Sequence, residues 1–248
     1  MSVVMPAYNE VENIRRAILT LKRLAENSGV PDYEIIVVDD GSVDGTRQES
    51  LRLADGVRIR VVGYPHNRGK GFAVKYGVER TTGDIILLLD SDLEIRPSRL
   101  STYLMNLQDC DIVVGSKRHR KSQVQAPAMR RVLSFAFHVL VKLLVDVRVS
   151  DTQSGLKVGR ADCLRGVFRL MSVKKYAFDV EMLIVAQLLN CRIKEVPIEI
   201  RLGGRFRTRE IVRMFIDILG IAYRLRVKRW YQSNLNSDRP SYPPIVRW

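Results

Sequence analysis

Residues 85 to 94 read IILLLDSDLE, an aliphatic run that ends in two aspartates one residue apart. The aliphatic part predicts a strand that is buried on both faces, as in a parallel sheet covered by helices. Ligands of such sheets bind at the carboxyl ends of the strands. Asp90 and Asp92 are therefore expected to face a ligand, close enough together to bind one hard divalent cation, with Glu94 as a further oxygen donor.

A second acidic strand end supports this interpretation. Residues 35 to 46 read IIVVDDGSVDGT and pass from an apolar strand pattern into Asp39, Asp40 and a glycine-rich turn. Aspartate and serine are also common in turns, so one acidic pair alone would fit a polar turn that caps the next helix. Two such strand ends in one sheet favour a ligand site, and carboxylates with a cation suit a diphosphate.

The first half of the chain alternates strand and helix patterns. This alternation predicts an α/β fold with a doubly wound, mostly parallel, Rossmann-like sheet flanked by helices. Asn9 and Glu12 have the spacing of a capping box at the start of the first helix. The expected strands lie near residues 2–7, 34–39, 57–63, 84–90 and 111–115, and the expected helices near 10–27, 43–54, 69–81 and 98–107.

Beyond residue 116 the regular alternation ends. We expect a main domain of residues 1–207, with halves that meet at residues 115 and 116, followed by an amphipathic helix and a tail over 208–248. The tail is expected to be poorly ordered or packed as an arm. The expected elements are helices near 129–146, 160–170, 179–190 and 208–231 and strands near 156–159 and 193–200.

The chain is strongly basic, and the charge is localised. Its 248 residues include 46% hydrophobic residues, which suits one large domain with a full core, and the formal net charge is +14. Residues 116–131 and 201–229 hold almost all of the excess. The usual partners of such a face are nucleic acid, anionic lipid head groups or a phosphorylated substrate.

Cysteine usage and the amino-terminal sequence bear on location. Cys110, Cys163 and Cys191 are far apart and lack metal-binding spacing, so we expect reduced cysteines of an intracellular protein. The start of the chain lacks the basic and apolar regions of a signal peptide. No stretch reaches the roughly 20 apolar residues that span a bilayer.

Two amphipathic segments suggest contact with a membrane surface. Residues 132–147, VLSFAFHVLVKLLVDV, and the last helix combine apolar stripes with neighbouring basic residues. This composition is typical of helices that lie in a membrane interface, and the two could form one lipid-facing platform. Most amphipathic helices instead cover their own core, and that alternative stays open. With membrane contact, the expected location is peripheral, on the cytoplasmic side of the membrane.

Eight sequence blocks carry a resemblance to a known family. The blocks occur in the order typical of the family and extend over residues 2 to about 210. Through them the chain resembles the inverting family 2 glycosyltransferases of GT-A fold, and within that family the dolichyl-phosphate mannose or glucose synthases. Each block alone is weakly specific, whereas eight in sequence are specific. The blocks are VMPAYNE (4–10), DDGSVDGT (39–46), HNRGKGFAVKYG (66–77), LLLDSDLE (87–94), GSKRHR (115–120), DTQSGLKV (151–158), FDVEML (178–183) and EVPIEI (195–200).

The resemblance implies that residues 1–115 bind a nucleotide-sugar and residues 116–207 bind the acceptor. In relatives, the first strand end and the first aspartate of the DDGS turn line the nucleoside, and arginines after the last strand clamp the diphosphate. The nucleotide-sugar site implied here consists of Pro6, Ala7, Tyr8, Glu10, Asp39, Gly69, Lys70, Asp90, Ser91, Arg205 and Arg207.

The resemblance also implies a divalent cation, Mg²⁺ or Mn²⁺. Asp90 would face the donor sugar or diphosphate and Asp92 would bind the cation, so both are candidate catalytic residues. The position of Glu94 usually holds glutamine in dolichyl-phosphate synthases. The additional negative charge should tighten the binding of a hard cation, and a cation that bridges the diphosphate stabilises the leaving group.

The acceptor separates two hypotheses. A lipid phosphate is already anionic near neutral pH, so it needs cations to hold it and no base. A sugar hydroxyl of a glycolipid would need a carboxylate to take its proton, and Asp179 stands where hydroxyl-using relatives place that base, although it would equally cap its helix. Glu181 is a weaker candidate base. The phosphate cradle expected here is Arg118, Arg130, Arg131 and Ser154.

The sequence therefore predicts a hexosyltransferase at a membrane surface. GDP-mannose is the first expectation for the donor, UDP-glucose stays open, and a polyprenyl phosphate is preferred as acceptor over a glycolipid. The resemblance also implies a possible small membrane-protein partner, which relatives without spanning helices recruit. Nucleic-acid binding is disfavoured because no reading motif or stacking platform accompanies the charge. A nucleotidyltransferase is disfavoured because PAYNE, at residues 6–10, is no glycine-rich phosphate loop.

Overall fold

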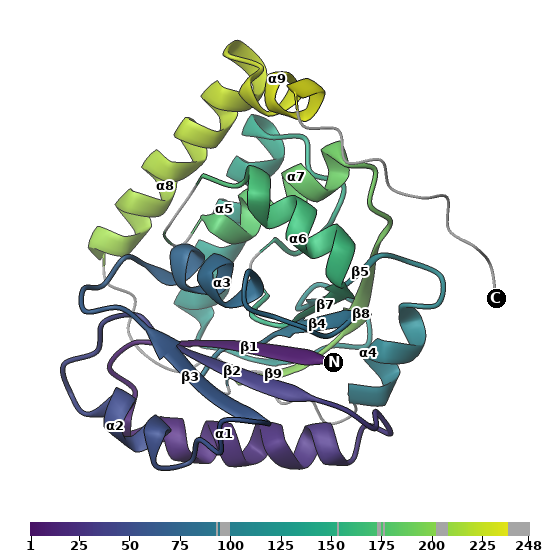
Figure 1. Cartoon of the computed structure of the whole chain (residues 1–248). Helices are drawn as coiled ribbons and strands as arrows, with labels where there is room; N and C mark the ends of the chain where they lie inside the picture. Colours follow the sequence, from purple (N-terminus) through teal and green to yellow (C-terminus); the bar gives the residue numbers. More distant parts are fainter. Residues whose placement is uncertain are drawn as a thin grey trace.

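A central sheet covered by helices on both faces organises the molecule (Figure 1). The computed structural model describes residues 1–92, 94, 100–152, 154–172, 175, 177–201 and 208–237. Within these ranges seven strands form the sheet in the order β3-β2-β1-β4-β7-β5-β8. All neighbouring pairs are parallel except the two that β7 forms. The predicted doubly wound, mostly parallel α/β sheet is confirmed.

The elements follow the predicted order, with shifts of a few residues at their ends. The strands of the sheet are β1 (Ser2–Ala7), β2 (Glu34–Asp39), β3 (Ile59–Gly63), β4 (Ile85–Leu88), β5 (Ile112–Ser116), β7 (Lys157–Arg160) and β8 (Ile193–Pro197). The helices are α1 (Val11–Glu26), α2 (Thr46–Leu51), α3 (Lys70–Val78), α4 (Leu100–Asn106), α5 (Ala128–Leu144), α6 (Ala161–Leu170), α7 (Phe178–Leu188), α8 (Thr208–Ala222) and α9 (Trp230–Ser237).

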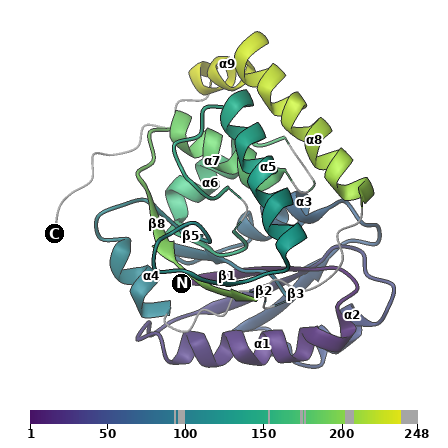
Figure 2. The same ribbon diagram turned by 180° about the vertical axis from the view of Figure 1, so that it is seen from behind.

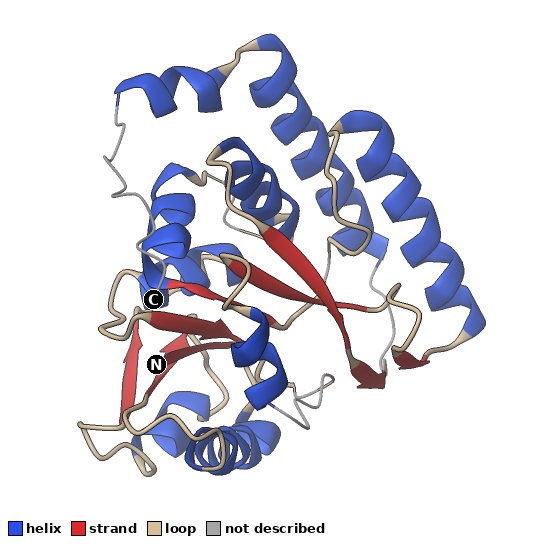
Figure 3. Cartoon of the chain, turned by 90° about the vertical axis from the view of Figure 1, so that its right-hand side faces the viewer, coloured by secondary structure: helices blue, strands red, loops and turns tan. Residues whose placement is uncertain are grey.

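Two hydrophobic layers hold the sheet between the helices. Successive strand residues face opposite sides of a sheet. Val4 packs with residues of α3, α6 and α7, whereas Val3 and Met5 pack with residues of α1 and α4. Figure 2 shows α1 on one side of the sheet and α5, α6 and α7 on the other, and Figure 3 shows the red strands between blue helices. Each fully buried aliphatic side chain contributes about 1.5–3 kcal/mol.

The strand register brings the first two acidic motifs together. Ala7 at the end of β1 pairs with Asp39 at the end of β2, and Val4 pairs with Leu88 at the end of β4. Since the three strands are parallel, their carboxyl ends meet at one edge of the sheet. The segments that follow them therefore lie side by side.

The strand predicted over 193–200 is interrupted at Ile198. The Ile198 side chain is buried in the α1-side layer, and its N–H donates to Ser122 Oγ over 3.0 Å. The chain then leaves the main sheet, and β9 (Glu199–Arg201) pairs with a short strand that was not predicted, β6 (Gln123–Gln125). The apolar pattern continues across this break because Ile198, which lies at the break itself, is buried.

The last helix is broken where a continuous helix was predicted. After α8 the chain forms a π-helical turn, η1 (Tyr223–Val227), and Arg229 adopts a left-handed conformation with φ 48°. The next element is α9, and the remainder of the predicted tail, residues 238–248, lies outside the described residues. Ile218, Ile221 and Tyr231 are buried with α6 and α7, so the segment from residue 208 to 237 shares their hydrophobic layer. In the described part of the chain, no helix has both the length and the apolarity that crossing a bilayer requires.

The prediction of three reduced cysteines is wrong. Cys163 of α6 and Cys191, just after α7, form a disulfide, and Cys110 is a buried free thiol. The two bonded residues are 28 positions apart, so their spacing gives no sign of contact. They meet because α6 and α7 pack against each other in the same layer.

The C-terminal helices should contribute to global stability. We expect Tyr231→Ala to lower the free energy of unfolding by about 3–5 kcal/mol, because this fully buried side chain leaves a cavity. Urea titration followed by circular dichroism measures the change. Tyr223→Ala is the matched control, since Tyr223 is half exposed, and it should cost less than about 1 kcal/mol. Equal effects of the two variants would contradict the packing described for α9.

Candidate active site

The segments after β1 and β2 are locked together by hydrogen bonds. Asn9 N–H donates to Ser42 Oγ over 3.0 Å, and Asn9 Oδ1 accepts from the N–H of Val43 over 3.0 Å. Glu10 N–H donates to Thr46 Oγ1 over 2.7 Å. The PAYNE and DDGSVDGT blocks therefore form one unit at the edge of the sheet.

The predicted capping box at the start of α1 is wrong. Glu10 is the residue before the helix, and no side chain caps it. Asn9 has φ 54°, and its side chain bonds the neighbouring loop at Val43 instead of the helix. A hydrogen bond between two loops that are distant in sequence cannot be predicted from local spacing.

Asp40 organises the loop that leads into α3, a role that the sequence analysis missed. Its carboxylate is buried and accepts from the Tyr64 hydroxyl over 2.7 Å and from Asn67 Nδ2 over 2.9 Å. It also accepts from the N–H groups of Arg68 and Gly69, over 2.8 and 3.0 Å. Asp40 thus fixes the HNRGK block, and the doubled aspartate of the DDGS turn was the available signal.

The first aspartate of that turn lies deeper than its predicted contact with a nucleoside suggests. Asp39 is buried, its Oδ1 accepts from the N–H of Ser42 over 3.1 Å, and Arg47 Nη1 lies 3.8 Å from its Oδ2. Gly41 has φ 73°, and a Cβ atom there would overlap the backbone of His66. The turn and the loop before α3 therefore approach as closely as glycine allows.

The predicted residues at the end of β1 differ in accessibility. Pro6 and Ala7 are buried, Glu10 is partly buried, and Tyr8 is 46% exposed at the rim. Tyr8 is thus the member of this group whose ring is available to a ligand.

Lys70 and Asp90 form the ion pair at the centre of the site. Lys70 is the first residue of α3, and Asp90 follows β4. Lys70 Nζ lies 2.7 Å from Asp90 Oδ2. Burial alone would lower the pKa of Lys70, but the carboxylates of Asp90 and Asp179 outweigh it and raise that pKa. A Cβ atom at Gly155 would overlap the Asp90 carboxylate, so the QSG turn presses directly on this pair.

Asp92 is the carboxylate best suited to a cation. It is exposed, whereas Ser91 beside it is buried, and its Oδ1 accepts from the N–H of Glu94 over 3.0 Å. Desolvation at the site and the charge of Asp90 raise the pKa of Asp92 to about 6. Closely spaced anionic oxygens of this kind favour a bound cation.

The described residues provide only part of a cation site. Among them, no three His, Cys, Asp or Glu side chains gather at metal-binding distances. Mg²⁺ is commonly held by one or two carboxylates together with substrate phosphates and water. Asp92, with Glu94 as a second candidate, fits this kind of site, in which the diphosphate completes the coordination.

Asp179 is held in a buried ion pair with Lys157. Lys157 Nζ donates to Asp179 Oδ1 and to the backbone oxygen of Ser154. Lys157 Nζ lies 5.8 Å and Lys70 Nζ 5.7 Å from the centre of the Phe178 ring. The sequence analysis did not single out Lys157, whose position in an aliphatic strand pattern gave no sign of its partner.

Ser154 is fully buried inside this turn. A Cβ atom at Gly115 would lie 3.1 Å from Ser154 Oγ, so the hydroxyl packs against β5. The structure brings Ser154 next to the Lys157 ammonium through its backbone and does not place its side chain at the surface.

Three later sequence blocks also interlock. Glu195 accepts from Ser150 Oγ over 2.7 Å and from the N–H of Asp151 over 3.0 Å. Asp151 Oδ2 in turn accepts from the N–H of Lys117 over 2.7 Å. EVPIEI thus holds DTQSG, and DTQSG holds the start of the basic GSKRHR loop.

The predicted phosphate cradle is partly described. Arg118 Nη2 donates to the backbone oxygen of Ser134 in α5 over 3.2 Å, and Arg131 is exposed on the same helix. The side chain of Arg130 and all of Arg205 and Arg207 lie outside the described residues. Arg118 therefore joins the basic loop to α5.

The raised pKa of Asp92 predicts a pH-dependent gain of stability on its removal. An aspartate whose pKa rises to about 6 on folding costs stability above that pH and costs none below its unfolded value of 3.8. We expect metal-free Asp92→Asn to melt at a higher temperature than wild type at about pH 8, with the gain shrinking towards about pH 4. Differential scanning calorimetry measures it, with exposed Asp32→Asn as control. An equal gain at both pH values would contradict the assignment.

Comparison with known proteins finds a matching family and similar sequences. Residues 2–168 match the family model described as glycosyl transferase family 2. A dolichyl-phosphate beta-glucosyltransferase of Trichomonas vaginalis is 32% identical over 246 residues, which cover 92% of this chain and 72% of that relative. The dolichyl-phosphate beta-glucosyltransferase of Mus musculus is 34% identical over 214 residues, which cover 80% of this chain and 66% of that relative.

Solved structures share the fold. Glucosyl-3-phosphoglycerate synthase from Mycobacterium tuberculosis, in complex with uridine diphosphate, aligns with a TM-score of 0.66 and 21% identity, over 90% of this chain and 78% of that chain. The same enzyme in complex with Mn²⁺, uridine diphosphate and glucosyl-3-phosphoglycerate aligns with a TM-score of 0.65 and 20% identity, over 92% and 79%. From the family match, the similar sequences and the shared architecture, we conclude that this chain belongs to glycosyl transferase family 2 and has the GT-A fold.

Proposed function

We propose that this protein is an inverting glucosyltransferase that moves glucose from UDP-glucose to dolichyl or another polyprenyl phosphate at a membrane surface, with a divalent cation. The related sequences from Trichomonas vaginalis and Mus musculus are both named dolichyl-phosphate beta-glucosyltransferases. The first expectation from the sequence, mannose from GDP-mannose, is therefore replaced by the glucose donor that had stayed open.

The observation that carries the choice of acceptor is the engagement of both candidate bases. Asp179 is paired with Lys157, and Glu181 is fully buried and accepts hydrogen bonds from Ser172 and Tyr231. A sugar hydroxyl would need an available carboxylate to take its proton. A phosphate monoester needs none, since its second pKa lies near ~6. This supports a lipid phosphate over a glycolipid hydroxyl.

In this proposal the donor lies across the ends of β1, β2 and β4. Tyr8 borders the nucleoside, and the fixed Gly69–Lys70 segment approaches it from the start of α3. Lys70 keeps the Asp90 carboxylate oriented towards the sugar, with Gly155 as a rigid backing. A cation held by Asp92 and Glu94 would neutralise charge on the departing nucleoside diphosphate. Arg205 and Arg207 remain candidates for the opposite side of the diphosphate.

The acceptor phosphate would reach the anomeric carbon from the side of the QSG turn and α5. Arg118, Arg130 and Arg131 are the proposed cations that hold it, and the buried Ser154 would act by shaping the turn. Attack from the face opposite the diphosphate inverts the anomeric centre. Binding both reactants in one orientation replaces a rare encounter with a positioned step.

Exposed apolar side chains support a membrane surface as the place of reaction. We call them the apolar platform, which α5, α8 and η1 carry. The helices α5 and α8 pack against each other, and Arg226 Nη2 of η1 donates to the backbone oxygen of Leu143 in α5 over 3.4 Å. Helices with an exposed apolar face beside basic residues bind the interface of anionic membranes. We propose peripheral binding on the cytoplasmic side. The platform consists of Met129, Val132, Phe135, Val139, Leu143, Phe215, Ile216, Leu219, Tyr223 and Val227.

Product analysis tests the proposed function. The purified protein, a short-chain polyprenyl phosphate in detergent and Mg²⁺ or Mn²⁺ should convert UDP-glucose to polyprenyl phosphate glucose and release UDP. Turnover with GDP-mannose, or with a glycolipid that lacks a phosphate monoester, should be lower by at least about tenfold. Asp92→Asn should abolish the transfer from UDP-glucose. Faster transfer to the glycolipid would refute the acceptor, and faster use of GDP-mannose would refute the donor.

The contact between Gly155 and Asp90 makes a sharper prediction. A methyl group at residue 155 must displace the Asp90 carboxylate, and small misplacements of a reacting group can cost about 100-fold in rate. We therefore expect Gly155→Ala to lower kcat by about 100-fold in the same assay, with UDP binding by calorimetry little changed. Gly220→Ala is the matched control, because a Cβ atom there would meet its nearest neighbour at 3.5 Å. Unchanged kcat in Gly155→Ala would remove Asp90 from the catalytic group.

A further inference from the structure

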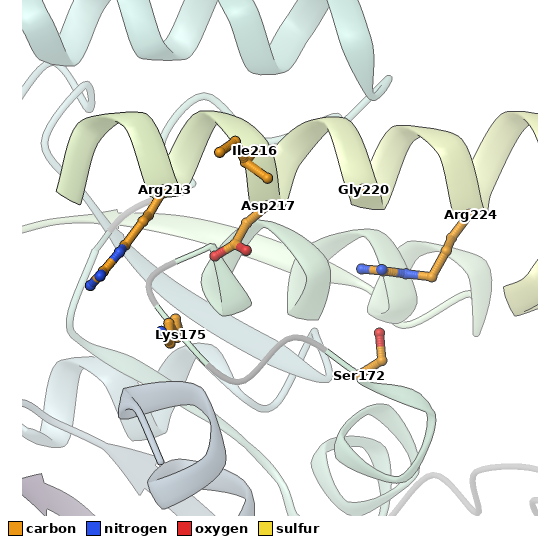
Figure 4. Close-up of a pocket in the computed structure, with 7 residues that line it drawn as sticks. All are labelled: Ser172, Lys175, Arg213, Ile216, Asp217, Gly220 and Arg224. Atoms are coloured by element: carbon orange, nitrogen blue, oxygen red, sulfur yellow. The ribbon is translucent and has the colours of Figure 1, made fainter. Parts of the chain in front are cut away.

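A pocket of about 490 Å³ lies between α8 and the connection from α6 to α7 (Figure 4). Its volume is within the range of small-molecule sites, roughly 300–1,000 Å³. In Figure 4, Arg213 and Asp217 of α8 and Arg224 of η1 project towards the side on which Ser172 and Lys175 lie. Arg118 of the proposed acceptor site instead contacts α5, so the two basic groups rest on different elements.

One wall of the pocket is built around a fully buried glutamate. Glu181 Oε1 accepts from Ser172 Oγ over 3.0 Å and from the Tyr231 hydroxyl over 2.5 Å. Arg224 Nη2 lies 3.6 Å from the same oxygen, and Arg224 Nε donates to the Tyr231 hydroxyl over 3.2 Å. These bonds join α7, η1 and α9 and hold Arg224 in place. The wall is therefore shaped before any ligand binds.

Two polar atoms of this pocket are buried without a hydrogen-bond partner in the described ranges. They are Asp217 Oδ2 and Arg224 Nη2. Arg224 Nη2 has the Glu181 carboxylate at 3.6 Å but no hydrogen bond, and Asp217 Oδ2 has no hydrogen bond either. A buried donor or acceptor without a hydrogen bond is costly, and a ligand group of the opposite kind satisfies it. Burial raises the pKa of Asp217, while Lys175 and Arg224 lower it in part. The pocket thus suits a ligand that combines an anionic group with a hydrogen-bond donor.

The pocket opens beside the apolar platform. Ile216 lines the pocket, is 59% exposed, and also belongs to the platform with Phe215 and Leu219. A molecule bound here can therefore place a polar head against Lys175 and Arg213 and an apolar tail along the exposed face of α8. An amphiphile matches this arrangement better than a small soluble anion does.

We propose that this pocket binds the head group of an anionic glycerophospholipid that carries free hydroxyls. The phosphate would lie against Lys175 and Arg213, with Arg224 behind them, and a head-group hydroxyl would donate to Asp217 Oδ2. This inference rests on the proposed function at a membrane surface and adds a second lipid site to it. The lipid would hold the enzyme on the bilayer and would not be consumed.

Vesicle co-sedimentation of the full chain tests the charged part of the site. The probes are phosphatidylcholine vesicles containing a fixed minor fraction of phosphatidylinositol or of phosphatidylserine. Each basic residue at an anionic surface changes binding about fivefold, so Lys175→Gln/Arg213→Gln should bind phosphatidylinositol vesicles about 25-fold more weakly. Arg16→Gln/Arg23→Gln is the matched control, with the same charge loss on exposed positions of α1. Equal losses in the two double variants would overturn the proposal.

Asp217→Ala separates a built site from general attraction. The wild type should prefer phosphatidylinositol to phosphatidylserine vesicles, and the variant should lose this preference while it binds both. General attraction predicts instead that removing a negative charge strengthens binding to both and leaves the ratio unchanged, which would overturn the proposal. So would binding of free inositol phosphate without binding to vesicles.

Activity in detergent keeps this inference separate from the proposed function. With a short-chain polyprenyl phosphate in detergent, Lys175→Gln/Arg213→Gln should keep kcat within about twofold of wild type, because the pocket residues take no part in transfer. A large loss in that assay would place the pocket in the acceptor site and overturn a separate lipid site. If the wild type itself shows no transfer, the proposed function fails, while the vesicle result still decides the pocket.

Discussion

The ion pair between Lys70 and Asp90 is the contact on which the site depends. The pair joins the start of α3 to the end of β4. Gly155, which precedes the antiparallel strand β7, packs against it. A carboxylate without such a partner is better solvated in water and would turn towards solvent. Since both side chains are only partly exposed, the pair is shielded enough to stay oriented and open enough to meet a substrate.

The family blocks form a chain of contacts around that pair. PAYNE is bonded to the DDGS turn, Asp40 of that turn holds the loop before Lys70, and Lys157 beside the QSG turn holds Asp179. Many of the recurring polar residues thus bind other loops and leave only a few side chains for a ligand.

Several features could be predicted from the sequence because they depend on local pattern. The order of strands and helices, the parallel sheet and the meeting of two acidic strand ends all follow from apolar periodicity and from the rule for strand ends. The capping box, the unbroken last helix and the reduced cysteines were wrong. Each depended on a partner far along the chain, such as Val43 for Asn9 or Cys191 for Cys163.

The sequence by itself determined the family, the sheet and the chemical types gathered at its edge, because side-chain periodicity and residue order are local properties. Only the tertiary structure decided which charges neutralise each other. It paired Asp179 with Lys157, buried Ser154, and placed Arg213 and Lys175 around one pocket. The physical reason is that electrostatic energy depends on distance and burial in three dimensions, and these arise from packing between segments that are remote in sequence.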